Sequence, residues 1–166
     1  MTARVEPLAG HDVSGFTSGN PALDDWLRHH APTATGQGTR TYVLVDDGGS
    51  VVGYFAIAPH LLERDDAPGR LARGAPKQIP AILLAKLALD ASVQGRGMGS
   101  ELLVVALEVI VAAARRAGGR VVVVDAIDGS ASAYYEHHDF KPLPGHTRRL
   151  VMKLSSVAKA LGLPWP

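Results

Sequence analysis

A run of alternating glycines is the clearest chemical signal in this sequence. Gln94-Gly95-Arg96-Gly97-Met98-Gly99 lies between an apolar stretch and a long run with the periodicity of a helix. Glycines let a backbone turn sharply and approach a ligand, and a following helix presents unpaired N–H groups at the positive end of its dipole. This arrangement suits a pyrophosphate, for which the guanidinium of Arg96 adds a forked donor.

Two common nucleotide-binding motifs do not fit this loop. A P-loop needs a lysine directly after its last glycine, and Ser100 follows Gly99 here. A Rossmann turn needs Gly-x-Gly-x-x-Gly and an acidic residue at the end of a second strand about 20 residues on, where this sequence still has a helical pattern. The spacing Gln-x-x-Gly-x-Gly is instead that of the acyl-CoA pyrophosphate loop of GNAT acetyltransferases. A glycine-rich turn without a ligand is the remaining alternative.

The resemblance to that superfamily extends beyond the loop. Lys86–Asp90 followed by the loop, and Arg120–Asp125 followed by residues 133–140, resemble its conserved core. More narrowly, residues 14–154 are similar to the GNAT toxins of type II toxin–antitoxin systems, the TacT-like toxins. The toxin motifs are matched by segments Phe16–Leu27, Arg40–Val43, Val52–Ala58 and Ala131–Phe140.

The resemblance implies acetyl transfer from acetyl-CoA to the α-amino group of an aminoacyl-tRNA, which would stop translation. Tyr135 occupies the family position of the group that protonates the departing CoA thiolate. A phenol has an ordinary pKa of about 10 and can donate this proton without first being ionised. The alternative for Tyr135 is a core aromatic on an amphipathic helix, a role that suits Tyr134 better. No general base stands out, and water often serves in this superfamily.

The contacts to acetyl-CoA are also implied by the resemblance. The backbone of Leu87, Ala88 and Leu89 is expected to pair with the pantetheine arm as an added strand would. The pyrophosphate is expected along Gln94, Gly95, Arg96, Gly97, Met98, Gly99 and Ser100. The chain departs from the family at Asp139, where glycine is usual before Phe140. Aspartate tolerates the left-handed conformation of a helix end less well than glycine, so this departure bears on the local turn and not on the reaction.

The distribution of charge bears on the partners of the chain. The formal net charge is +1, so the chain as a whole is not a polycation. Basic residues gather locally in segments 64–77 and 141–159, and such clusters can engage phosphates. An ordinary solvated surface is an equal alternative. The residues expected to contact tRNA are Arg40, Arg73, Lys77, Arg148 and Arg149.

Composition excludes several other kinds of site. The chain has no cysteine, which rules out disulfides, thiolate nucleophiles and zinc–thiolate sites. The histidine pairs 29–30 and 137–138 are each adjacent in sequence and near expected helix C-termini, so no metal site is expected. No signal peptide is recognisable, and no run approaches the roughly 20 apolar residues of a membrane span. A cytoplasmic protein without a membrane partner is therefore expected. The resemblance adds a ribbon–helix–helix antitoxin and a homodimer.

Two further functions remain open from the sequence. The chain could be a GNAT enzyme that acetylates a small-molecule amine or a protein N-terminus, which an acidic acceptor pocket would favour. It could also be a non-catalytic module that binds acyl-CoA or an antitoxin. Binding of acetyl-CoA without turnover on any acceptor would favour that function.

The elements that must position these residues are those of one α/β domain over residues 1–166. Strands are expected at 4–8, 39–45, 51–58, 82–89, 121–124, 140–143 and 148–153, and helices at 99–117, 130–138 and 155–161. Asn20 is expected to cap a helix that Pro32 stops, and residues 59–80 to form a long connection with a short helix near 61–64. A hairpin turn at 46–49 and a strand–helix–strand order later in the chain predict a mixed antiparallel and parallel sheet flanked by helices, the GNAT fold.

Overall fold

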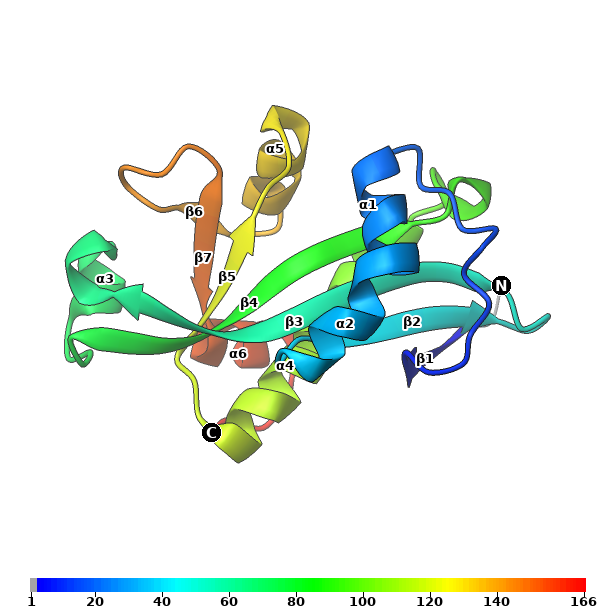
Figure 1. The fold of residues 1–166 in the computed structure, drawn as a ribbon. Coiled ribbons are helices and arrows are strands. Elements are labelled where there is room, and N and C mark those ends of the chain that lie inside the picture. Colours follow the sequence, from blue (N-terminus) through cyan, green and yellow to red (C-terminus); the bar gives the residue numbers. More distant parts are fainter. Residues whose placement is uncertain (1–2) are drawn as a thin grey trace. The chain divides into compact units, whose positions relative to one another are not determined.

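The computed structural model describes residues 3–166 (Figure 1). Its strands are β1 (Ala3–Pro7), β2 (Arg40–Asp46), β3 (Val51–Glu63), β4 (Gln78–Leu89), β5 (Val121–Asp125), β6 (Lys141–Pro142) and β7 (Arg149–Lys153). Its helices are α1 (Pro21–Asp25), α2 (Ala31–Gly36), α3 (Gly69–Ala72), α4 (Met98–Ala117), α5 (Gly129–His137) and α6 (Leu154–Leu161).

The strands form one mixed sheet in the order β1-β2-β3-β4-β5-β7-β6. β4 pairs with β5 in parallel, whereas β2 is antiparallel to β1 and β3, and β7 is antiparallel to β5 and β6. The expected mixed sheet with flanking helices is confirmed. The chain divides into two compact units. The first unit is the chain up to Ala58 with Ala85–Ala106, and the second unit is Pro59–Leu84 with Leu107–Pro166.

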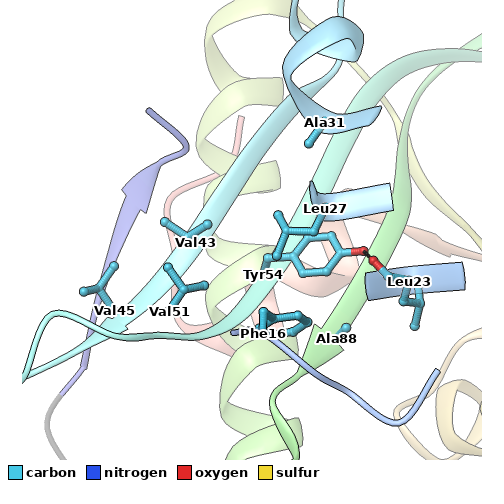
Figure 2. Close-up of a cluster of buried hydrophobic side chains, with 9 residues drawn as sticks. All are labelled: Phe16, Leu23, Leu27, Ala31, Val43, Val45, Val51, Tyr54 and Ala88. Carbon is cyan, nitrogen blue, oxygen red and sulfur yellow. Dashed lines mark hydrogen bonds between the residues drawn. The ribbon is translucent and has the colours of Figure 1, made fainter. Parts of the chain in front are cut away.

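The core of the first unit is built around Tyr54 (Figure 2). Its ring is fully buried, stacks on Trp26 and meets Phe16 edge to face. The Tyr54 hydroxyl donates to the backbone oxygen of Leu23 at 2.7 Å, so the one polar atom of this ring has a partner. The β2–β3 hairpin supplies the other wall of the cluster, with Val43 buried in it. This packing joins the N-terminal helices to the hairpin.

The first helix begins as expected but does not end at Pro32. The Asn20 side chain accepts hydrogen bonds from the backbone N–H groups of Ala22 and Leu23, which confirms it as the N-cap. The chain then continues through a π-helical turn, Trp26–His30, into α2. The prediction that Pro32 stops the helix was therefore wrong. Proline disrupts a helix interior but is tolerated in a first helical turn, and Pro32 lies in the first turn of α2, directly after the π-helical turn.

The continuation of this helix also corrects the expected place of one histidine pair. His29 and His30 lie in the π-helical turn rather than at a helix C-terminus, with Asp25 within 3.8 Å and 3.2 Å of their rings. His137 does lie in the last turn of α5, as expected.

In the second unit, two strands reach further than the sequence indicates. Residues 59–63 continue β3 and β4 already begins at Gln78, so the expected helix near 61–64 and much of the expected connection were wrong. The remaining connection, residues 64–77, holds a 3-10 turn and the short helix α3. The backbone N–H of Arg64 donates to the carbonyl of Lys77 at 2.8 Å, which closes the connection where the two strands end.

Helix α4 carries a continuous apolar stripe along its length. The buried residues recur at helical spacing, at Leu102, Leu103, Ala106, Leu107, Ile110, Val111 and Ala114. The expected core helix is thus confirmed, with its first residue at Met98. Within residues 3–166, no helix is both long and apolar enough to cross a membrane.

Candidate active site

The glycine loop of the first unit has the backbone conformation that its composition predicts. Gly95 and Gly97 have φ of +77° and +76°, a region that residues with a Cβ rarely adopt. A Cβ at either position would meet no atom of residues 3–166 within 4 Å, so backbone conformation rather than space calls for glycine here. Arg96 lies exposed between them, and α4 begins at Met98. The arrangement expected for a pyrophosphate loop is present.

Gln94 ties this loop to two other segments of the first unit. Its side-chain amide nitrogen donates to the backbone oxygen of Ser18 at 2.7 Å and to that of Leu89 at 2.8 Å. Both protons of the side-chain amide are therefore used in bonds to backbone carbonyls. The sequence predicts Gln94 as a cofactor contact, and the structure gives its amide nitrogen a fastening role.

Asp90 holds the segment that leads into this loop. One carboxylate oxygen accepts from the backbone N–H of Thr17 at 2.9 Å, and the other accepts from the backbone and hydroxyl of Ser92 at 3.0 Å and 2.6 Å. Burial alone would raise the pKa of Asp90, but the hydrogen bonds from Ser92 and Thr17 outweigh it and lower that pKa. Asp90 thus holds residue 17 against the loop as a carboxylate.

The C-terminal part of β4 extends beyond its ladder with β5. The paired residues run from Ala81–Val121 to Leu84–Val124, while β4 continues to Leu89. Ala88 is buried, and Leu87 and Leu89 are half-buried. Backbone that continues past its partner strand can accept an added strand, which is the role expected for these residues toward pantetheine.

Tyr135 lies on α5 in the second unit, buried with 8% of its surface exposed. Its ring meets Tyr134 and Phe140 edge to face, each at a centroid distance of 5.5 Å. Burial raises the pKa of Tyr135 well above its ordinary value, and Tyr134 adds to that shift. A phenol is protonated at neutral pH even at its ordinary pKa of about 10, and burial keeps Tyr135 in that form, as a proton donor must be.

The turn after α5 forms despite aspartate at the position of the usual glycine. Asp139 has φ of +71°, in the left-handed region. Its backbone N–H donates to the carbonyl of Glu136, and that of Phe140 donates to the carbonyl of Tyr135. These two bonds, together with the contact between the rings of Phe140 and Tyr135, make a Schellman motif. Tyr135 is thus part of the helix ending itself.

A charged cluster that the sequence does not reveal lies in the second unit. Arg149 donates from Nε and from one terminal nitrogen to the two carboxylate oxygens of Asp125, at 2.7 Å and 2.8 Å. Its other terminal nitrogen is 3.1 Å from Nε2 of His60. The hydrogen bond from Arg149 lowers the pKa of Asp125. Asp125 could have been suspected, because it ends a buried strand, but His60 falls in a segment with the composition of a loop.

The remaining cations expected at tRNA are exposed, and two of them contact backbone. Arg40 donates to the carbonyls of Thr35 and Thr39, next to the end of α2. Arg148 donates to the carbonyl of Ile127 at 3.1 Å. Arg73 and Lys77 lie exposed in the connection after β3.

Charge is divided unequally between the two units. The first unit holds 5 Lys and Arg against 8 Asp and Glu, a net of −3, and the second holds 12 against 8, a net of +4. The overall charge of +1 therefore conceals a basic second unit. In residues 3–166, no group of three or more His, Asp or Glu side chains could hold a metal ion.

Comparison with known proteins gives concordant matches over nearly the whole chain. A family model described as an acetyltransferase (GNAT) domain matches residues 37–142. The tRNA-acetylating toxin of Mycobacterium tuberculosis is 41% identical over 152 residues, which cover 91% of each chain.

Two solved structures add ligands and partners to this picture. The structure of AtaT complexed with acetyl-methionyl-tRNAfMet has a TM-score of 0.86 at 27% identity, over 96% of this chain and 99% of that chain. A mutant AtaT toxin bound to the C-terminus of the antitoxin AtaR and acetyl-CoA has a TM-score of 0.81 at 26% identity, over 96% and 98%.

Proposed function

The chain belongs to the GNAT acetyltransferase family, and from that membership we propose that it acetylates the α-amino group of an aminoacyl-tRNA with acetyl-CoA. A blocked α-amino group cannot form a peptide bond, so the product stops translation and the protein is a toxin. The relative that is 41% identical is a tRNA-acetylating toxin, and the structure of AtaT with acetyl-methionyl-tRNAfMet supports the same acceptor class.

The residues present fit acetyl-CoA as the acetyl donor. Gly95 and Gly97 turn the backbone so that its N–H groups, with those of the first turn of α4, can receive the pyrophosphate. Arg96 is exposed, so its guanidinium is accessible to a phosphate. The backbone of Leu87–Leu89 continues past the β5 ladder and can pair with the pantetheine arm.

The observation that carries the reaction is the buried, protonated phenol of Tyr135. The acceptor amine attacks the thioester carbonyl, the carbon–sulfur bond breaks, and Tyr135 gives its proton to the departing sulfur. A thiol is the stronger acid by roughly 1.5 pKa units in water, so this transfer must be coupled to the loss of the thiolate. The proton that the amine loses goes to water, and the phenolate of Tyr135 recovers its proton from solvent.

The basic second unit supports a polyanionic acceptor. Its net charge of +4 attracts phosphates, and it carries Arg73, Lys77 and Arg148 exposed. A small amine or polyamine is itself a cation and would be favoured by an acidic acceptor pocket instead. Arg40, in the first unit, is the further contact expected from the family resemblance.

The proposal extends to protein partners and to location. A mutant of the neighbour AtaT binds the C-terminus of its antitoxin, which supports an antitoxin for this chain, and the resemblance to TacT-like toxins favours a ribbon–helix–helix protein. We also propose a homodimer in the cytoplasm, where charged tRNA is found. Light scattering of the purified protein tests the dimer, and co-purification with the product of a neighbouring gene tests the antitoxin.

The decisive experiment is transfer of label from acetyl-CoA to bulk charged tRNA, comparing the protein with Tyr135→Phe. Label on the aminoacyl group that falls about 100-fold in the variant is expected, within the range of general acid catalysis. Bound acetyl-CoA with no label on any charged tRNA would overturn the proposal. A panel of amines and peptides would then identify a small-molecule acetyltransferase.

A further inference from the structure

The connection between β5 and α5 is fastened to the start of β7 by several independent contacts, all within the second unit. The backbone N–H of Ala126 donates to the carbonyl of Arg148 at 2.9 Å, and the side chain of Arg148 donates to the carbonyl of Ile127. Asp125 is paired with Arg149 through both of its carboxylate oxygens. Residues 125–127 are therefore held at both backbone and side chain.

Each of the three guanidinium nitrogens of Arg149 has a side-chain partner. Nε and one terminal nitrogen face Asp125, and the other terminal nitrogen faces His60 on β3. A planar guanidinium that is bidentate on a carboxylate has a fixed orientation. The same nitrogens are the ones that a phosphate would need, and the side chain is only 24% exposed. These contacts disfavour the tRNA contact expected from the sequence.

The contact between Arg149 and His60 fixes the protonation of the histidine. A guanidinium can only donate, so Nε2 of His60 must accept, and the ring is neutral with its proton on Nδ1. Burial, and next the charge of Arg149, lower the pKa of His60 in agreement with this arrangement. Together with the two bonds to Asp125, the contact with His60 therefore sets the plane of the guanidinium.

What this cluster holds in place is the start of the helix that carries Tyr135. Asp128 follows the fastened residues directly and caps α5, its side chain accepting from the backbone N–H of Ala131 at 2.8 Å. Tyr135 lies within the same short helix, so a shift or rotation of residues 125–128 moves the phenol with it. A displacement of about 1 Å at a reacting group can cost on the order of 100-fold in rate.

We propose that Arg149, oriented by Asp125 and His60, is a positioning residue for Tyr135 and not a phosphate contact. This inference rests on the proposed function, because it concerns proton donation in that reaction. A positioning residue affects the rate of the bound complex, whereas a phosphate contact affects the binding of charged tRNA. The two roles are therefore separable by kinetics.

The test compares Arg149→Lys, His60→Gln and His60→Ala with Arg116→Lys as a matched control on the exposed end of α4. Lysine keeps the charge but cannot bond Asp125 and His60 together, whereas glutamine keeps an acceptor in place of Nε2. We expect Arg149→Lys to lower kcat on charged tRNA about 10- to 100-fold, with both KM values within about twofold of wild type. His60→Gln should retain the rate, and His60→Ala should lose several-fold.

A second readout does not depend on activity. Hydrogen exchange of the backbone amides in residues 126–132 should be faster in Arg149→Lys than in Arg116→Lys, with the other strands of the second unit unchanged. If Arg149→Lys fails to fold, the two His60 variants decide by the same kinetics and exchange.

The outcomes separate this inference from the proposed function. If wild type acetylates no charged tRNA, the proposed function fails, and the exchange comparison alone decides whether Arg149 holds the connection. If wild type is active but Arg149→Lys keeps kcat and raises only the KM for charged tRNA, Arg149 is a phosphate contact and the inference is overturned. Equal exchange in Arg149→Lys and Arg116→Lys overturns it as well.

Discussion

The contacts that fix the position of Tyr135 also raise its pKa. The rings of Tyr134 and Phe140 exclude water from it, which raises its pKa, and the carbonyl of Tyr135 accepts the closing bond of the Schellman motif. Phe140, which follows the left-handed Asp139, takes part both in the burial of the phenol and in the helix ending that places it. Asp139 is therefore the residue at which α5 carries its strain.

Replacing Asp139 by glycine should stabilise the protein. A residue with a Cβ in the left-handed region costs about 1–2 kcal/mol relative to its usual conformations, and aspartate recovers part of this. We expect Asp139→Gly to raise the free energy of unfolding by about 0.5–1 kcal/mol, measured by urea denaturation. Asp139→Val should lower the free energy of unfolding, by more than Asp139→Gly raises it. Equal stabilities of all three proteins would contradict the strain.

Gln94 offers a second test at the scale of one residue. Gln94→Leu removes the side-chain donors to the carbonyls of Ser18 and Leu89. We expect a loss of about 1–2 kcal/mol in stability and a several-fold weaker binding of acetyl-CoA, measured by calorimetry. The exposed Arg96→Gln should weaken binding without a change in stability. A Gln94 variant of unchanged stability would mean that its side chain serves the ligand and not the loop.

At the scale of elements, the sequence predicted those features that depend on residues close together in the chain. The cap at Asn20, the hairpin turn after Asp46 and the apolar stripe of α4 each follow from a few neighbouring residues. The extension of β3 over residues 59–63 could not be predicted, because residues such as Pro59 and Glu63 are typical of a loop. They form a strand through pairing within the sheet, where β4 is the neighbour of β3. The Asp125–Arg149–His60 cluster could not be predicted either, because its three residues are far apart in sequence and meet only in the folded chain.

Gly53 lies where β3 packs closely against the end of β4. A Cβ there would lie 3.2 Å from Cδ2 of Leu89 and 3.4 Å from the carbonyl oxygen of Ala88. We expect Gly53→Ala to cost about 1–3 kcal/mol and to weaken acetyl-CoA binding, because it displaces the backbone that we propose pairs with pantetheine. Gly36→Ala, with open space at its Cβ, is the control and should be neutral or slightly stabilising in thermal unfolding.

The ion pair that anchors β7 predicts part of the acid sensitivity. The pKa of Asp125 lies below its ordinary value of 3.8 in the folded protein, so the unfolded chain binds more protons in that range. The stabilisation is complete above pH 3.8 and is lost as pH falls through the lowered pKa. Since Asp125 is 46% exposed, we expect less than about 1 kcal/mol from this pair. Asp125→Asn should reduce the loss of stability between neutral pH and pH 3, and an identical pH profile would contradict the pairing.

At the scale of the whole molecule, the division of charge matters more than its sum. A chain of net charge +1 shows little general attraction to nucleic acid, yet the second unit carries +4 and the first −3. A polyanion is therefore drawn to one unit and repelled by the other. The attraction of the second unit makes the binding of charged tRNA dependent on salt.

The exposed connection after β3 should supply a measurable part of that attraction. Each phosphate contact contributes close to one unit to the slope of log K against log salt. We expect Arg73→Gln with Lys77→Gln to weaken binding of charged tRNA and to reduce the slope by about 2, measured by filter binding without acetyl-CoA. Arg115→Gln with Arg116→Gln removes the same charge from the same unit at the end of α4, and should leave the slope within about half a unit of wild type. If both double variants lower the slope equally, the second unit attracts tRNA through its overall field, and the connection after β3 makes no phosphate contact of its own.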